Sequence, residues 1–198
     1  MSKYLFIGSH PDDLELCCGG TIVKLVQYGH NVHITAMSSY IGINDDLIHE
    51  YTASAKLMGV SIMRVSSFRP RNFLFDRTEI LHQLHGYLLD GYDYIFTHSA
   101  NDIHQDHKVI GEESLRAFKK LNLVTYQAEW NSLTYESNYF VELTEENMAK
   151  KLEAMACYKS QQHRPYFDKT FTYSRALLAG AKIGVKYAEP FRIVNMHG

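Results

Sequence analysis

The chain has 198 residues, of which 45% are hydrophobic, and 20 basic residues against 22 acidic ones give a net charge of -2. A chain of this length can bury one sizeable core, so we expect a single domain over residues 1–198. With a pI near 6.6 there is no excess of positive charge to attract a phosphate backbone, and we expect no nucleic-acid partner.

The N-terminal segment and the cysteines indicate the cellular compartment of the protein. The apolar run at 4–7 reaches His10 and two aspartates almost at once, which is too short for a signal peptide or a membrane-spanning helix. The cysteines Cys17, Cys18 and Cys157 are odd in number and form no CxxC pair, so a thiolate zinc site is not expected and a reducing compartment fits better. We therefore expect a cytoplasmic protein without membrane insertion.

The first two thirds of the chain alternate between strand-like and helix-like segments. Short apolar or β-branched runs predict strands, and apolar residues at helical spacing that end in glycine predict helices. In chain order the pattern predicts a strand at 4–8, a helix at 21–28, a strand at 31–37, a helix at 45–58, a strand at 61–67, a helix at 76–89, a strand at 92–97 and a helix at 107–121. Such alternation is typical of an α/β fold, here a single Rossmann-like domain with a mostly parallel sheet flanked by helices.

The last third is less regular. It contains predicted strands at 124–129 and 140–143 and predicted helices at 145–158 and 171–184. The four prolines, Pro11, Pro70, Pro165 and Pro190, fall in predicted connections or at an element end.

Two loops are rich in metal-binding side chains. Residues 9–15 follow the first predicted strand and read Ser-His-Pro-Asp-Asp-Leu-Glu, while residues 98–107 follow the fourth predicted strand. Because ligands of open α/β sheets bind at the carboxyl ends of the strands, we expect the two loops to converge in space.

A catalytic zinc ion needs about three protein ligands from imidazole and carboxylate groups and an open position for water. His10, Asp13 and His107 would supply them. Asp12 then stands beside the metal as a general base that takes a proton from water. His104 could donate to the oxyanion of the tetrahedral intermediate, and Asp106 could orient it or keep it charged.

Each of these features alone has an ordinary structural explanation. An Asp-Asp pair after proline is usually a turn or helix cap, and isolated histidines such as His98 are more often solvated than functional. Gly19-Gly20 lacks the G-x-G-x-x-G spacing of a dinucleotide site, so we expect no nucleotide cofactor. It is the combination of two His/Asp clusters at two strand ends that predicts a metal site.

At these residues the chain resembles the PIG-L / LmbE-like superfamily of zinc-dependent N-acetyl-sugar deacetylases. The first signature of the superfamily stands here as His-Pro-Asp-Asp-Leu-Glu at 10–15 with Gly-Gly-Thr at 19–21, and the second as Asp-Ile-His-Gln-Asp-His at 102–107. The resemblance implies His10, Asp13 and His107 as zinc ligands, Asp12 as the base, and His104 with Asp106 as the oxyanion and proton-donor pair. Another divalent transition metal such as Fe²⁺ would suit the same ligands.

The substrate contacts are less well marked. Many members carry an arginine where this chain has Leu47, and Arg69, Arg71 or Arg164 could take its place. Tyr158 and Gln161 are further candidates. The resemblance implies a small amino-sugar substrate and a homo-oligomer, and later segments are similar to a branch associated with surface-polysaccharide and amino-sugar metabolism.

Two other functions stay open at this point. One is a zinc hydrolase of a different amide or of a phosphoester, although the sequence has no second carboxylate-rich cluster of the kind a two-metal phosphoesterase needs. The other is a non-catalytic sugar- or nucleotide-binding protein on the same fold, for which an intact base and oxyanion pair would be superfluous.

Overall fold

The computed structural model of the chain describes residues 1–134 and 136–197. The strands are β1 (Lys3–Gly8), β2 (Asn31–Ala36), β3 (Ile62–Val65), β4 (Tyr94–His98), β5 (Asn122–Tyr126), β6 (Tyr139–Leu143) and β7 (Tyr187–Asn195). The helices are α1 (Asp13–Gln27), α2 (Asp46–Met58), α3 (Arg77–Gly86), α4 (Gln105–Ala117), α5 (Glu145–Ala156) and α6 (Lys169–Ile183). Short 3₁₀ helices lie at Tyr87–Asp90, Glu129–Asn131, Lys159–Gln161 and Pro165–Phe167.

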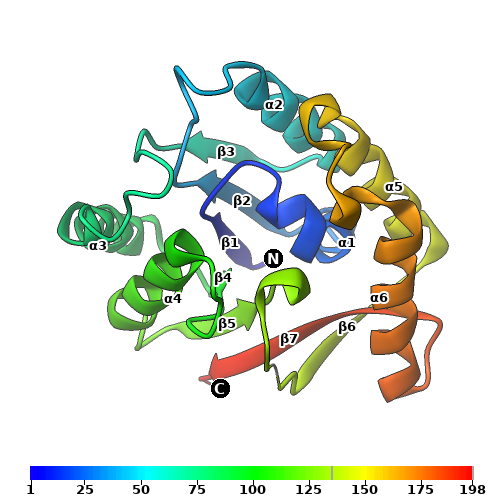
Figure 1. The fold of residues 1–198 in the computed structure, drawn as a ribbon. Coiled ribbons are helices and arrows are strands. Elements are labelled where there is room, and N and C mark those ends of the chain that lie inside the picture. The colour runs from blue at the N-terminus through cyan, green and yellow to red at the C-terminus, as the bar shows by residue number, and fades with distance from the viewer. Residues whose placement is uncertain (135, 198) are drawn as a thin grey trace.

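The described strands form one seven-stranded sheet in the order β3-β2-β1-β4-β5-β7-β6. Strands β1 to β5 are parallel, and β7 runs antiparallel to both β5 and β6. Helices cover both faces of the sheet (Figure 1). This arrangement confirms the predicted α/β fold with a mostly parallel sheet.

The two faces of the sheet have separate apolar cores because successive side chains of a strand point to opposite sides. In β1, Phe6 packs with the residues of α1, α2 and α5, whereas Leu5 and Ile7 pack with those of α3 and α4. In Figure 1, α1, α2 and α5 accordingly lie on one side of the sheet and α3 and α4 on the other. The central position of β1 and β4 places the loops that follow them next to each other.

Helix α1 begins earlier than the sequence predicts. The pattern suggested a helix at 21–28, but α1 already starts at Asp13, so Gly19 and Gly20 lie within the helix. A Cβ atom on Gly20 would lie 2.4 Å from Leu143 Cδ1, so a larger residue here requires the buried Leu143 side chain of β6 to move. The backbone N–H groups of Gly20 and Thr21 also donate to the Glu189 carboxylate, at 3.0 and 2.7 Å.

Strand β7 was not predicted, and it contains Pro190, which the sequence placed in a connection or at an element end. The first half of β7 pairs with β6, where Pro190 stands opposite Phe140, and residues 192–195 pair with β5. Because proline removes one donor from a strand ladder, Pro190 does not signal a strand in the sequence.

None of the helices in the described ranges is long and apolar enough to cross a membrane.

Candidate active site

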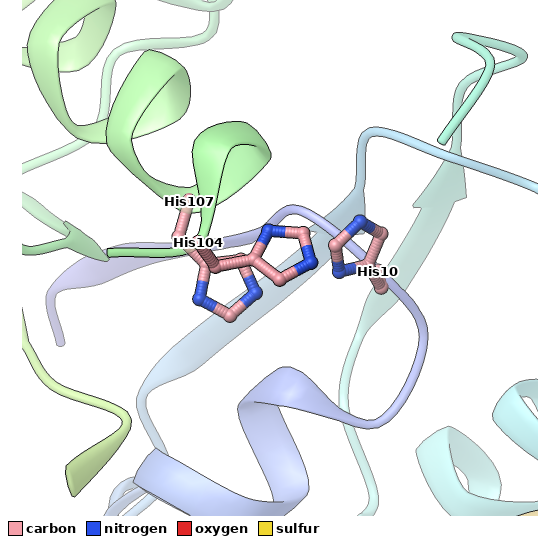
Figure 2. A group of neighbouring side chains, drawn as sticks. All are labelled: His10, His104 and His107. Atoms are coloured by element: carbon pink, nitrogen blue, oxygen red, sulfur yellow. The ribbon is translucent and has the colours of Figure 1, made fainter. Parts of the chain in front are cut away.

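Two loops at the carboxyl edge of the sheet bring the site together. His10 and Asp12 lie between β1 and α1, and Asp13 is the first residue of α1. The other loop joins β4 to α4, with His104 as the N-cap of α4 and His107 in its first turn. Figure 2 shows His10 beside the imidazoles of His104 and His107. The two predicted clusters therefore converge at the edge where α/β folds bind ligands.

Asp13 lies among three imidazoles. Its Oδ1 is 3.3 Å from His107 Nε2, and its Oδ2 is 3.6 Å from His10 Nδ1 and 3.2 Å from His98 Nε2. His10, Asp13 and His107 are 7%, 4% and 3% exposed, so these charges are largely removed from water. Burial by itself would raise the pKa of Asp13, but His107 and His98 hold it well below its usual value. Positive charge is therefore favoured next to this carboxylate.

Two further carboxylates contact the outer nitrogens of His10 and His107, that is, the ring nitrogens that lie away from Asp13. Asp106 Oδ2 lies 2.9 Å from His10 Nε2, and Asp102 Oδ2 lies 2.9 Å from His107 Nδ1. With Nε2 donating to Asp106, His10 can offer the lone pair of Nδ1 on the side of Asp13. Burial opposes a charge on His107, but Asp13 and Asp102 raise its pKa to about 10, so its Nε2 favours a proton, or a metal cation in the place of that proton, on the side of Asp13. A carboxylate behind a histidine is the usual arrangement at metal ligands.

The carboxylate of Asp106 thus bonds His10 and not His104, unlike the sequence interpretation. His104 is fixed instead by the backbone, because its Nδ1 accepts the N–H of Asp106 at 3.2 Å. Its ring stacks on His107 with centroids 4.4 Å apart. Burial lowers the pKa of His104 to about 4, with His107 and His10 adding to the effect. A neutral imidazole with its proton on Nε2 fits this environment better than a charged one.

The donor atoms present suit a metal ion. Two overlapping groups in the described chain have ligand atoms within 4.8 Å of one another: His10, His104 and His107, and Asp13, His98 and His107. His107 belongs to both groups, and His10 and Asp13 to one each. His98 is fully buried, and its Nε2 already accepts the backbone N–H of Ser9 at 3.1 Å. The motif analysis assigned no role to His98, the last residue of β4, whose Nε2 lies 3.2 Å from Asp13 Oδ2.

Asp12 differs from the neighbouring Asp13 in lacking partners. It is 8% exposed and lines the cavity, and no residue in the described part of the chain donates a hydrogen bond to its carboxylate. Burial raises the pKa of Asp12 well above its usual value, and the charge of Asp13 adds to this increase. A carboxylate of this kind is well suited to accept a proton.

The site opens into a cavity of about 290 Å³. Of the five predicted substrate contacts, Arg71, Gln161 and Arg164 line it. Arg69 lies in an adjoining hollow that shares Tyr40 with the cavity. Tyr158 is fully buried and does not reach the cavity, because its hydroxyl donates to Glu15 Oε1 at 2.8 Å.

The structure adds lining residues that the sequence did not single out. They include Tyr40, Asn44, Trp130, Asn131 and Tyr166. Trp130 and Tyr166 stack with ring centroids 4.3 Å apart and an interplanar angle of 7°. No signal in the sequence marks these residues, since they come from separate loops and have no motif spacing.

Backbone strain is concentrated at the same cavity. In the described ranges, the non-glycine residues with positive φ are Asp12 at 97°, Tyr40 at 55° and Arg71 at 66°, and all three line the cavity. Such conformations cost about 1–3 kcal/mol each and tend to cluster at functional sites. This observation supports the cavity as the functional site independently of the metal-binding side chains.

Two relatives of known name are similar to most of the chain. The chain is 25% identical to an uncharacterized deacetylase, YaiS, from Escherichia coli, over 79% of this chain and 90% of that protein. It is 26% identical to the diacetylchitobiose deacetylase of Thermococcus kodakarensis, over 98% of this chain and 84% of that protein.

Solved structures share the whole fold. The N,N'-diacetylchitobiose deacetylase of Pyrococcus horikoshii superimposes with a TM-score of 0.81 at 24% identity, covering 98% of this chain and 84% of that one. GalB from Pseudomonas putida, a 4-carboxy-2-hydroxymuconate hydratase, has a TM-score of 0.80 at 17% identity, covering 100% and 98%. These likenesses show the fold alone. The PIG-L family model, described as GlcNAc-PI de-N-acetylase, matches residues 5–118, and the chain belongs to this family.

Proposed function

We propose that the protein is a zinc-dependent hydrolase that removes the acetyl group from an N-acetylated amino sugar or amino-sugar conjugate, with residues 1–198 as one catalytic domain. The observation that carries this proposal is the arrangement around Asp13. Two histidines, each backed by a carboxylate, turn their inner nitrogens toward Asp13, and the partnerless carboxylate of Asp12 lies beside them in a cavity. Membership of the PIG-L family and the two deacetylase relatives support the same reaction.

In this proposal His10, Asp13 and His107 hold the metal. Zinc bound there, or another divalent transition metal such as Fe²⁺, would supply a Lewis acid for the acetamide carbonyl and lower the pKa of water to about 7. The remaining chemistry falls to side chains of the cavity.

Asp12 acts on the proton of water. Its carboxylate accepts this proton while the water oxygen bonds to the carbonyl carbon, and it then passes the proton to the amide nitrogen as the C–N bond breaks. One water is consumed, and acetate and a free amino sugar are formed. The raised pKa of Asp12 favours this exchange because the protonated form is not strongly disfavoured.

His104 acts on the carbonyl oxygen. Since His104 Nδ1 accepts the backbone N–H of Asp106, its proton resides on Nε2, from which it can donate a hydrogen bond to the negative charge that develops on that oxygen. Asp106 supports this role through its backbone and through His10, not as a partner of the His104 ring.

A panel assay for acetate release tests the proposal. Protein stripped with a chelator and then reloaded with zinc is incubated with N-acetylglucosamine, its disaccharide and N-acetylated sugar conjugates. We expect acetate from at least one substrate with zinc and none from the stripped protein. Acetate release that is independent of metal would contradict the metal-dependent mechanism.

The same assay separates the competing functions. Hydration of an unsaturated acid without acetate release would favour a reaction of the kind named for GalB, which has the same fold. Tight binding of a sugar with no turnover by the zinc-loaded protein would favour a binding protein.

A further inference from the structure

The arginines of this chain fall into two groups. Arg64, Arg77, Arg116 and Arg175 each form an ion pair with an aspartate or glutamate. For Arg69, Arg71, Arg164 and Arg192 the described residues provide no carboxylate partner within ion-pair distance. Two of these four line the active-site cavity, and Arg69 lies in the adjoining hollow. Arginines without a carboxylate at ion-pair distance therefore gather at the site, where the charge of Asp12 acts on Arg164 from further away.

Arg71 is held in place at a conformational cost. The N–H of Asn72 donates to Arg69 O at 3.1 Å, closing a turn in which Pro70 precedes Arg71, and Arg71 has a φ of 66°. Glycine is the usual residue at the third position of such a turn, because other side chains are strained there. Glycine would adopt this φ without strain, so arginine stands here at a conformational cost of the kind that clusters at functional sites.

The backbone of Arg71 is also tied to the catalytic centre. Its N–H donates to Asp106 Oδ2 at 2.7 Å, and its carbonyl accepts from Gln105 Nε2 at 2.7 Å. The same Asp106 oxygen contacts His10 Nε2. Arg71 is thus anchored on both backbone groups at a fixed place beside the predicted metal ligands, while its guanidinium has no hydrogen-bond or ion-pair partner among the described residues.

Arg164 reaches the cavity from another element. Its Nη1 donates to the hydroxyl of Tyr166, and its guanidinium lies 5.8 Å from the centre of the Tyr166 ring. Tyr166 is itself fixed by stacking on Trp130. These contacts use only part of the guanidinium, which has five N–H donors.

The cavity therefore contains more hydrogen-bonding and charged groups than binding of a neutral sugar requires. Asn44, Asn131 and Gln161 already offer neutral groups that can bond hydroxyls. Guanidinium groups are suited to bidentate binding of oxyanions. We propose that the substrate of the deacetylation proposed above carries an anionic group, a phosphate or carboxylate on the amino sugar or its aglycone, and that Arg71 binds it with help from Arg164. This inference rests on the proposed function.

Matched sugars test this specificity. The zinc-loaded protein is assayed for acetate release from N-acetylglucosamine, its 1-phosphate, its 6-phosphate and N-acetylmuramic acid, which separate neutral, phosphate and carboxylate forms. We expect kcat/KM for one of the anionic sugars to exceed that for the neutral sugar by about 10- to 100-fold. This factor corresponds to the contribution of one hydrogen bond to a charged group. The preference should decrease as salt concentration rises.

The decisive variant is Arg71→Gly. It removes the guanidinium but suits the positive φ, so folding should not suffer. We expect the loss of kcat/KM in Arg71→Gly to be about 10- to 100-fold larger for the preferred anionic sugar than for the neutral sugar. Arg192→Gln, which removes an arginine without a carboxylate partner outside the cavity, is the matched control and should change neither.

Calorimetric binding of the same sugars distinguishes this proposal from the proposed function. An Arg71-dependent preference for the anionic sugar without acetate release would support this inference and contradict deacetylation of these sugars. Acetate release with no anionic preference, or with equal losses for both sugars in Arg71→Gly, would overturn this inference and leave deacetylation standing. Absence of any binding and any turnover would overturn this inference as well.

Discussion

A substitution of Asp102 tests whether the carboxylate behind His107 fixes the protonation state of this predicted metal ligand. Its Oδ2 lies 2.9 Å from His107 Nδ1, and its Oδ1 accepts the backbone N–H of His104 at 2.8 Å. In Asp102→Asn one of the two oxygens becomes an NH₂ group, which meets an N–H donor whether it is turned toward His104 or toward His107. The readiest relief is for His107 to lose the proton of Nδ1 and keep the proton of Nε2, the nitrogen that faces Asp13 and that the metal requires.

The cost of this change can be estimated from the arrangement. Asp102 is 3% exposed, so water cannot easily replace the lost bond. Loss of a carboxylate behind a metal-binding histidine typically lowers metal affinity about 10- to 100-fold, or about 1.4–2.7 kcal/mol. We expect a loss of zinc affinity in this range with the fold retained.

Competition with a chromophoric zinc chelator measures this affinity directly, and circular dichroism checks the fold. Asp76→Asn is the matched control, since it removes the same charge from a helix N-cap that makes no side-chain capping bond. Unchanged zinc affinity in Asp102→Asn would show that the carboxylate does not prepare His107 for the metal.

Gly20, His33 and His104 allow tests of packing, of pH-dependent stability and of catalysis. Gly20→Ala places a Cβ 2.4 Å from Leu143 Cδ1 and should lower the free energy of unfolding, measured by urea titration, by about 1–3 kcal/mol. Gly86→Ala, whose Cβ would have no atom within 4 Å, is the control and should be neutral or stabilising. Equal effects of the two substitutions would refute the packing argument. Burial, together with the charges of Lys3 and Arg64, lowers the pKa of His33 to about 4. Between about pH 4 and 6.5 the unfolded chain therefore binds one more proton at this residue than the folded chain does. The free energy of unfolding should fall as the pH drops through this window, by at most about 1.4 kcal/mol per pH unit from His33. His33→Gln should reduce this slope by the contribution of one proton, while His98 and His104, whose pKa values burial also lowers to about 4, keep contributing. A slope that is unchanged in His33→Gln would show that His33 does not contribute to it. His104→Ala should lower kcat about 10²- to 10³-fold with zinc retained, and loss of zinc would instead make His104 a ligand.

Much of the fold was predictable because the sequence patterns are local. The alternation of buried strands and helices is visible in the hydrophobic spacing, and left-handed glycines end α2 and α6 as predicted. The start of α1 was missed because Gly19 and Gly20 look like a loop in sequence. They are helical because β6 and Glu189, distant in sequence, pack against them. Strand β7 was missed for a similar reason, since its pairing with β5 and β6 is not encoded locally.

The candidate site was predictable only in part. Motif spacing placed His10, Asp13 and His107 together, and the structure brings them together. The pairing of Asp106 with His10 could not be read from the sequence, because neighbours in a motif need not be neighbours in space. Tyr40, Trp130 and Tyr166 line the cavity from separate loops, and only the tertiary structure assembles them.

Acetate release and zinc content of Asp12→Asn, measured beside the unmodified protein on its best N-acetylated sugar, decide whether Asp12 is the base. The asparagine keeps the shape of Asp12 but cannot accept the proton of water. We expect full zinc content and a loss of kcat of about 10²- to 10⁴-fold. An Asp12→Asn protein that releases acetate at the original rate would contradict the proposed mechanism.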